Sequence, residues 1–398
     1  MLARIVNREE ASSAQEALLK IRESVTAPTK IAAFTHNFYK YPACFPETFP
    51  RSVIRSFSNP GDWILDPFLG GGTSAVEALA SKRNFVGLDI NDLAIFSSRF
   101  KTALLDNADF MELNNLSSSL ALPPLRDVDK DVDQYFFQNV PKNLANFVLR
   151  AKSKFSSMKR PRAQLFCTGV LLRTMQLELE REIPLQSPNL EDQYLNLLDN
   201  CIEKNLNFQR TTGIIDSKRL PSVQIFKADL ADPWGLDNMT IRRELDLAIT
   251  SPPYPQRHIL YSKWQIKGRA ETHLPYWIID SDDRHTPVHY AMGGRDSQAS
   301  LEIYLTSIHT AYANVNRIMK RGGIVVQVVA FNDIKKQFFG YLDAMNAAGF
   351  EEIKGIDRSS YDGRLWRTVP NQKWYNRYKL NESECREVVL FHYKKRTI

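Results

Sequence analysis

The sequence predicts an α/β fold in which helices cover a mostly parallel sheet. From Asp62 onward, short apolar runs bounded by turns alternate with helical patterns, as in a parallel sheet covered by helices. Several of these runs are also apolar enough to be strands buried on both faces. The length of 398 residues, with 43% hydrophobic content, allows a large core and leaves room for an insertion.

Seven runs qualify as strands, so the expected sheet is seven-stranded. Helices are expected after the first two strands, at about 72–81 and 91–105, the second capped by Asn91 or Asp92. The regular alternation then stops and resumes more than 100 residues later. The expected strands are 62–68, 84–90, 222–229, 246–251, 323–329, 350–357 and 388–393.

Two interruptions divide this pattern. The larger, 106–221, has helical periodicity at 140–155, 164–181 and 190–208 and indicates an inserted helical subdomain. The smaller, 255–299, is rich in His, Arg, Trp and Tyr without clear periodicity, which is typical of an ordered functional loop or lid. The expected domains are an N-terminal helical extension at 1–30, with a helix near 9–22, a main domain of 31–105 and 222–398, and the inserted subdomain.

Composition excludes several classes of protein. No stretch approaches the roughly 20 apolar residues that cross a bilayer, and the charged N-terminus does not resemble a signal peptide, so no membrane association and a cytoplasmic location are expected. Four cysteines lie far apart without neighbouring histidines at metal spacing. They predict neither a disulfide framework nor a metal site.

The positive charge is unevenly distributed. Residues 354–398 contain 11 Lys/Arg and 5 Asp/Glu, a surplus of 6 out of the net +7, interleaved with aromatic residues. This mixture suits phosphate contacts and base stacking, but it equally suits a solvated basic surface around a small aromatic core. The loop 255–299 offers a similar mixture. The candidate nucleic-acid contacts are Lys263, Trp264, Lys267, Arg269, Arg364, Arg367, Lys373, Trp374 and Arg377.

A glycine-rich loop follows the first strand and opens a helix. It reads Asp66-Pro67-Phe68-Leu69-Gly70-Gly71-Gly72-Thr73, and its bare backbone lets a ligand approach closely. The carboxylate of Asp66 would repel a pyrophosphate and attract a cation, which favours S-adenosylmethionine over NAD. The loop also lacks the Gly-Lys-Ser/Thr of ATP-binding loops.

Two further aspartates end neighbouring strands. Asp89, followed by Ile90, closes the second strand about 20 residues after the loop, where a carboxylate can bind both ribose hydroxyls; the alternative is a helix N-cap. Asp229 ends the third strand and is either an acceptor for the adenine amine or an ordinary strand-terminal aspartate.

A rigid turn, Ser251-Pro252-Pro253-Tyr254, follows the strand at 246–251, at the sheet edge where ligands bind. Consecutive prolines fix two φ angles and remove two backbone donors, so the turn presents acceptors. The Ser251 hydroxyl and the Pro252 carbonyl can accept hydrogen bonds from an NH₂ group, and Tyr254 offers a face to an unstacked base. A proline turn with a core tyrosine is the alternative, which the preceding glycine loop makes less favourable.

These residues resemble the amino-methyltransferases of DNA, which combine a Phe-x-Gly-x-Gly cofactor loop with an Asp/Asn/Ser-Pro-Pro-Tyr/Phe catalytic loop. Phe68, Gly70 and Gly72 match the first motif and 251–254 match the second. The segment 36–46, with Tyr41 and Pro42, is similar to the family's segment beside the methionine end of the cofactor. The resemblance covers about 31–105 and 222–330.

The resemblance implies a Rossmann-like methyltransferase fold, S-adenosylmethionine as cofactor and double-stranded DNA as partner, within a restriction-modification or defence system that can include a cognate endonuclease. Its serine form is associated with N4 of cytosine, and its Asp or Asn forms mainly with N6 of adenine. The insertion, the 255–299 loop and the basic tail remain alternative target-recognition regions.

The expected reaction is direct transfer to the amine of a flipped base, without a covalent intermediate, because no cysteine lies in a Pro-Cys motif. Three alternatives stay open: an N6-adenine DNA methyltransferase, an RNA base-amine methyltransferase, and a nucleic-acid-binding protein without activity. The sequence does not determine the oligomeric state.

Overall fold

The computed structural model describes most of the chain. The described residues are 11–26, 34–42, 44–118, 120–123, 133–181, 184, 188–217, 219–237, 239–240, 244–255, 264–266, 270–282, 298–331, 333–356, 360–368 and 386–395. None of the helices in these ranges is both long and apolar enough to cross a membrane.

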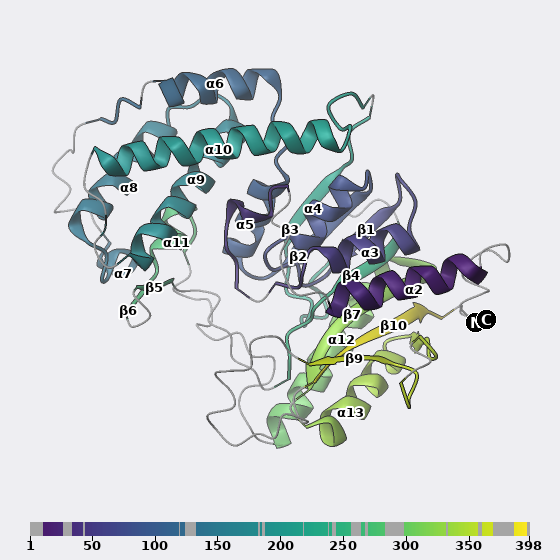
Figure 1. Ribbon diagram of the computed structural model, residues 1–398. Helices are drawn as coiled ribbons and strands as arrows, with labels where there is room; N and C mark the ends of the chain where they lie inside the picture. The colour runs from purple at the N-terminus through teal and green to yellow at the C-terminus, as the bar shows by residue number, and fades with distance from the viewer. Residues whose placement is uncertain are drawn as a thin grey trace.

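The main sheet has the order β3-β2-β1-β4-β7-β10-β8, with β9 paired to β10 (Figure 1). Neighbouring strands from β3 to β7 run parallel, whereas β10 is antiparallel to β7, β8 and β9. If β7 is counted as the fifth strand of this sheet, the five parallel strands have the 3-2-1-4-5 order of doubly wound nucleotide-binding folds. The strands are β1 Trp63–Asp66, β2 Asn84–Asp89, β3 Val223–Lys227, β4 Leu245–Thr250, β7 Met319–Phe331, β8 Phe350–Glu352, β9 Leu365–Thr368 and β10 Arg386–Lys394.

All seven expected strands are present, and the prediction of a mostly parallel, Rossmann-like sheet is confirmed. The strand β9, at the edge formed by β10, was not expected. Its four residues, Leu-Trp-Arg-Thr, do not alternate between apolar and polar, so the sequence pattern does not distinguish this strand from a loop.

Helices cover both faces of the sheet. Alternate residues of each strand enter opposite cores: Ile64 and Leu247 face the side covered by α2, α3 and α4, whereas Leu65 and Ala248 face α12 and α13. This burial on two faces explains why the strands are almost uniformly apolar. The helices are α2 Ala11–Thr26, α3 Thr48–Phe57, α4 Thr73–Ala80, α5 Asp92–Thr102, α12 Gln298–Ile318 and α13 Ile334–Ala347.

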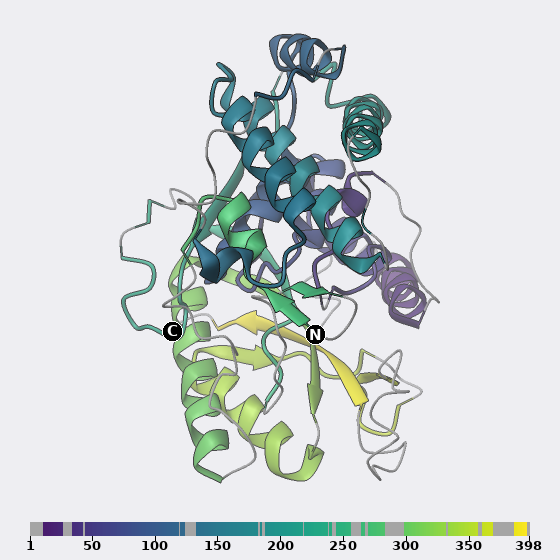
Figure 2. The ribbon, with the colours of Figure 1, turned by 90° about the vertical axis from the view of Figure 1, so that its left-hand side faces the viewer.

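The chain between β2 and β3 forms a helical module at one end of the sheet, and the core of this module also includes residues of α5 and of 38–41 (Figures 1 and 2). Gly169 of the module lies directly against the Phe100 ring of α5, where a Cβ atom would overlap that ring. The module therefore packs on the sheet through α5. Its helices are α6 Asn107–Ser118, α7 Gln134–Phe137, α8 Lys142–Phe155, α9 Pro161–Glu180 and α10 Asn189–Thr211.

The described part of the 255–299 loop belongs to the same module. It forms a small antiparallel pair, β5 Trp264–Ile266 and β6 Ala270–Thr272, followed by α11 Leu274–Ile278. The Thr272 hydroxyl donates to the Phe136 carbonyl at 3.0 Å, and Lys152 donates to the Ile278 carbonyl at 2.9 Å. Two segments separated by more than 100 residues thus form one packed body.

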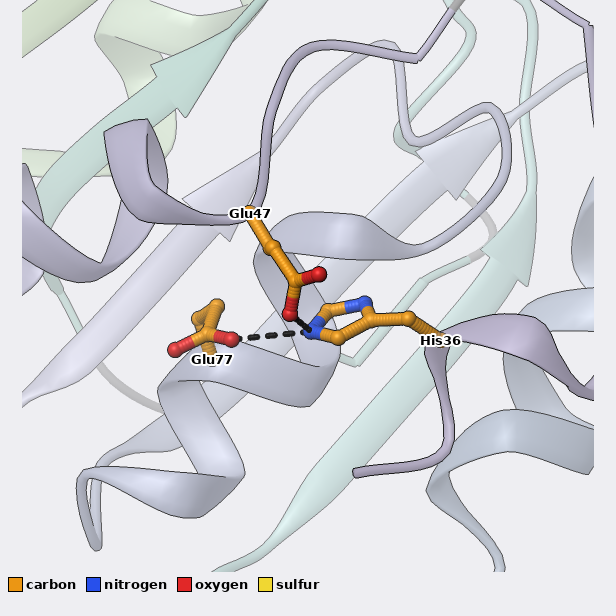
Figure 3. A group of neighbouring side chains, drawn as sticks. All are labelled: His36, Glu47 and Glu77. Carbon is orange, nitrogen blue, oxygen red and sulfur yellow. Dashed lines mark hydrogen bonds and ion pairs between the residues drawn. The ribbon is translucent and has the colours of Figure 1, made fainter. Parts of the chain in front are cut away.

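A buried ion network fixes the segment 36–42 to α4 (Figure 3). Glu77 of α4 is fully buried and faces His36 Nε2 at 2.8 Å, while Arg51 of α3 donates to both Glu77 oxygens, each at 2.8 Å. Glu47 lies 3.4 Å from the same imidazole nitrogen. Arg51 supplies the positive charge that neutralises the carboxylates of Glu47 and Glu77, a role that a bound cation could otherwise have.

Burial alone would raise the pKa of Glu77, but hydrogen bonds from His36 and Arg51 outweigh it and hold that pKa below its ordinary value. The network therefore stabilises the fold fully at neutral pH. Its contribution is lost as the pH falls through the lowered pKa.

We predict that Glu77→Gln destabilises the protein by about 3 kcal/mol, because it removes the fully buried carboxylate that accepts both hydrogen bonds of Arg51 and leaves only Glu47 beside this guanidinium. The loss should be measured by urea unfolding at neutral pH. Glu16→Gln removes an exposed carboxylate that pairs with Lys20 and should leave the unfolding midpoint unchanged. An unchanged midpoint in Glu77→Gln would show that the network does not stabilise the fold.

Candidate cofactor and catalytic site

The expected site residues meet at the carboxyl ends of three adjacent strands. Strand β1 pairs with β2 on one side and with β4 on the other. The loops that start at Asp66, Asp89 and Thr250 are therefore neighbours, although they lie far apart in the sequence. Ligands of open parallel sheets bind at this edge.

The glycine loop is shaped by positive φ angles and close contacts. Gly70 and Gly72 have φ of 49° and 75°, and α4 begins directly after Gly72, at Thr73. A Cβ atom on Gly71 would come within 2.8 Å of Tyr41 and of Cys44. The segment that resembles the family's methionine-end segment thus packs on the glycine loop, with Tyr41 buried and Pro42 exposed.

Helix α5 fixes the glycine loop through two side-chain hydrogen bonds. Lys101 is buried and donates to the Gly71 carbonyl at 2.7 Å, and the Ser98 hydroxyl donates to the Gly70 carbonyl at 3.3 Å. Burial lowers the pKa of Lys101. These two contacts were not expected, since nothing in a helix pattern shows which side chain reaches a loop carbonyl.

Asp66 differs from its interpretation as a carboxylate that faces a ligand directly. It is buried and accepts hydrogen bonds from the Thr250 hydroxyl at 2.7 Å, from the Ser74 hydroxyl and from the backbone N–H of Phe68 at 3.2 Å. Burial raises its pKa to about 6, against the effect of these bonds. Its charge is therefore next to the loop, but both of its oxygens bind the protein.

Asp89 closes the loop from the β2 side. Its Oδ2 accepts from the Gly70 N–H at 2.8 Å and its Oδ1 from the Asn91 N–H at 2.9 Å. The alternative interpretation as a helix N-cap is excluded, because Asn91 caps α5 through a 2.8 Å bond from the Leu93 N–H. Burial raises the pKa of Asp89 to about 6, although backbone hydrogen bonds act in the opposite direction.

The remaining cofactor candidates lie around these two aspartates. Asp229 is exposed two residues beyond the end of β3, and its Oδ1 accepts from the Ala231 N–H at 2.9 Å. Phe68 is partly buried and packs against Tyr312, with ring centroids 6.3 Å apart. Pro67 is buried, and Ile90 is partly exposed after Asp89.

The Ser-Pro-Pro-Tyr turn is anchored at three points. The Ser251 hydroxyl lies 3.1 Å from the Val328 carbonyl of β7 and 3.3 Å from the Tyr254 hydroxyl. Tyr304 of α12 donates to the Pro253 carbonyl at 3.0 Å. The phenol of Tyr254 donates to Glu387 at 2.9 Å, and the tyrosine side chain is only partly buried. Pro252 is buried.

The structure contradicts three expected nucleic-acid contacts. Trp264 is buried in the core of the helical module, where its indole N–H donates to the Tyr39 hydroxyl at 2.8 Å. Arg364 donates to both oxygens of Glu352, at 2.6 and 2.8 Å. Arg367 pairs with Glu387 and is 9% exposed. Lys263, Lys267, Arg269, Lys373, Trp374 and Arg377 lie outside the described residues.

These corrections share one physical cause. Interleaved arginines and aromatic residues pack inside a protein as readily as on its surface, when carboxylates such as Glu352 and Glu387 are available to pair with them. The described part of the basic tail therefore stabilises the sheet edge.

Comparison with known proteins supports the motif analysis. Residues 7–96 match the family model described as DNA methylase. A segment of 49 residues is 53% identical to the Type II methyltransferase M.MjaI of Methanocaldococcus jannaschii, covering 12% of this chain and 16% of that protein. A segment of 55 residues is 42% identical to the DNA adenine methyltransferase YhdJ of Escherichia coli, covering 14% and 19%. The matched part is thus less than a fifth of either relative.

Among solved structures, a TehB-like SAM-dependent methyltransferase from Corynebacterium glutamicum aligns with a TM-score of 0.31 and 8% identity, over 97% of this chain and 99% of that chain. At this TM-score the likeness supports no conclusion. The match over residues 7–96 agrees with the predicted resemblance to the amino-methyltransferases of DNA.

Proposed function

We propose that this chain transfers a methyl group from S-adenosylmethionine to an exocyclic amine of DNA, and that the amine is N4 of cytosine. One observation carries the proposal: the Ser-Pro-Pro-Tyr turn begins directly after Thr250, whose hydroxyl is bonded to Asp66 beside the glycine loop. A turn that presents acceptors for an amine is thus attached to a loop that suits the cofactor.

The residues around the glycine loop fit the cofactor by their chemistry. The partly exposed carboxylate of Asp89 suits the ribose hydroxyls, and the exposed Asp229 suits the adenine amine. The side-chain-free backbone at 70–72, next to Tyr41, suits the methionine end, and the charge of Asp66 favours the cationic ammonium and sulfonium.

When bound, S-adenosylmethionine supplies an electrophilic methyl group. The Ser251 hydroxyl and the Pro252 carbonyl would accept the hydrogens of the target amine and orient its nitrogen for attack. Tyr254 would stack on the base after it leaves the duplex. The transfer would replace the C–S bond of the cofactor with the new C–N bond, and the proton that the amine releases would pass to water.

This chemistry needs no cysteine nucleophile. Of the cysteines in the described ranges, Cys167 and Cys201 are buried in the helical module, and burial raises the pKa of each thiol to about 12. They are therefore neutral thiols that cannot activate a ring carbon. Cys44 contacts Gly71, which belongs to the glycine loop.

The choice of cytosine rests on the serine of the catalytic motif. N6 of adenine is the second candidate, since a relative that shares 42% identity over 55 residues is a DNA adenine methyltransferase. An RNA amine is the third. Incubation with labelled S-adenosylmethionine and unmethylated duplex DNA or transfer RNA, followed by identification of the methylated nucleoside, separates the three. We expect N4-methylcytosine in DNA, and label confined to RNA would overturn the proposal.

We propose that the helical module, 106–221, recognises the target together with 264–282. In this proposal the module is a subdomain inserted into a catalytic domain that comprises 31–105 and 222–398. Between residues 134 and 177 the chain contains eight Lys/Arg and no Asp/Glu. Four of them pair with carboxylates elsewhere in the chain, namely Arg150, Lys152, Arg160 and Arg162, and the others include cations suited to phosphates. Lys142 and Lys159 of this segment are exposed. A cognate endonuclease remains part of the proposal through the Type II relatives.

We predict that Tyr254→Ala slows methyl transfer by about fivefold to about 150-fold, because stacking on the flipped base, worth about 1–3 kcal/mol, is lost. Cofactor affinity, measured by calorimetry, should stay unchanged. Tyr361→Ala provides the matched control, since Tyr361 is 92% exposed, and should keep full activity. Wild-type turnover in Tyr254→Ala would remove this residue from the site.

We predict that S-adenosylmethionine binds less tightly as the pH falls through about 6. Burial raises the pKa of Asp66 and Asp89 from 3.8 to about 6, so each carboxylate becomes neutral below that pH and no longer attracts the cationic cofactor. Calorimetry between about pH 5 and about pH 7.5 measures this change.

The stability of the cofactor-free protein should change in the opposite direction. A carboxylate whose pKa is raised by folding binds protons more readily in the folded state, so its contribution to stability falls as the pH rises from about 4 to about 6. Asp89→Asn should weaken both pH dependences, and Asp66 should account for what remains. A cofactor affinity that does not vary with pH in the wild-type protein would contradict the prediction.

A further inference from the structure

A buried carboxylate behind the catalytic turn is not explained by the motifs. Glu387 of β10 is 5% exposed and lies between two partners. Its Oε1 accepts from the Tyr254 hydroxyl at 2.9 Å, and its Oε2 accepts from the guanidinium of Arg367 on β9. Both strands lie beyond the residues 7–96 that match the DNA methylase family.

The arrangement is a directed chain of hydrogen bonds. Burial raises the pKa of Tyr254, and the negative charge of Glu387 raises it further, so the phenol stays protonated and donates. A carboxylate accepts this bond more strongly than a neutral oxygen would. Arg367 supplies the counter-charge that offsets the desolvation penalty of burying Glu387.

The N-terminal helix completes the chain of contacts. Arg367 also donates to the Val25 carbonyl, at 2.9 Å, in the last turn of α2. The last carbonyls of a helix lack partners within the helix and carry partial negative charge, so a guanidinium suits them. Contacts therefore run from α2 through Arg367 and Glu387 to Tyr254.

We propose that Glu387 is a positioning residue for the methyl transfer: it holds the Tyr254 hydroxyl and thereby fixes the ring on which the target base stacks. The inference rests on the proposed function. Tyr254 stands in a turn, where the prolines fix the backbone but not the side chain. A second polar contact at the far end of the ring is what restricts its tilt, and small misplacements of a reacting base cost turnover steeply.

A double-mutant cycle tests this role. Glu387→Gln removes the charge that holds the phenol, and Tyr254→Phe removes the hydroxyl while keeping the ring. If both act through the same bond, each lowers kcat about tenfold, and the double variant also loses about tenfold instead of the hundredfold that independent effects would give. The KM for S-adenosylmethionine should remain unchanged in all three variants.

Glu352→Gln is the matched control. Glu352 of β8 forms an Arg–Glu pair with Arg364 in the same sheet. Its substitution should lower the thermal midpoint to a similar extent as Glu387→Gln but leave kcat unchanged. An equal loss of kcat in both variants would reduce the role of Glu387 to general stability and overturn the inference.

The outcomes separate this inference from the proposed function. A wild-type protein that transfers no methyl group to DNA would overturn the proposed function. An active wild type in which the two substitutions together cost about a hundredfold, the product of two independent tenfold losses, would overturn only the inference. Urea unfolding of the same four proteins gives a second cycle without any activity, and additive shifts there would likewise contradict a direct Tyr254–Glu387 bond.

Discussion

The site depends on one buried carboxylate. Asp66 stands at the end of the central strand β1, and its oxygens join the start of α4, through Ser74, to the end of β4, through Thr250. The cofactor loop and the catalytic turn are therefore held in register by the same group. Because a buried carboxylate is tolerated only when its oxygens are satisfied, any movement of one loop alone would leave Asp66 with a missing partner.

Much of the fold could be predicted from the sequence because burial leaves a local record. Strands buried on both faces are apolar throughout, and amphipathic helices repeat with their own period, so all seven strands and the helices α8, α9 and α10 were expected, whereas α6 and α7 were not. The short strand β9 and the membership of 264–278 in the module were missed. Both depend on partners more than 15 residues away, of which local periodicity holds no trace.

The residues of the site also fall into two groups, those that local motifs indicate and those that depend on distant partners. Asp66, Asp89 and the turn at 251–254 follow strand ends and could be located from local motifs. Thr250, Lys101 and Glu387 could not, since each acts through a hydrogen bond to a residue distant in sequence. Composition misled the interpretation of Arg364, Arg367 and Trp264, because residue type does not show whether a side chain meets DNA or a buried carboxylate.

The packing of the helical module limits how such a protein can be recombined. Its core includes α5 and the pair β5–β6, and Gln176 of α9 donates to the Lys40 carbonyl beside the cofactor loop at 2.9 Å. A chimaera that exchanged only 106–221 for the corresponding segment of another enzyme would place foreign helices against Phe100, Trp264 and Lys40. The helical module can therefore be exchanged only together with the three surfaces that it contacts, around Phe100, Trp264 and Lys40.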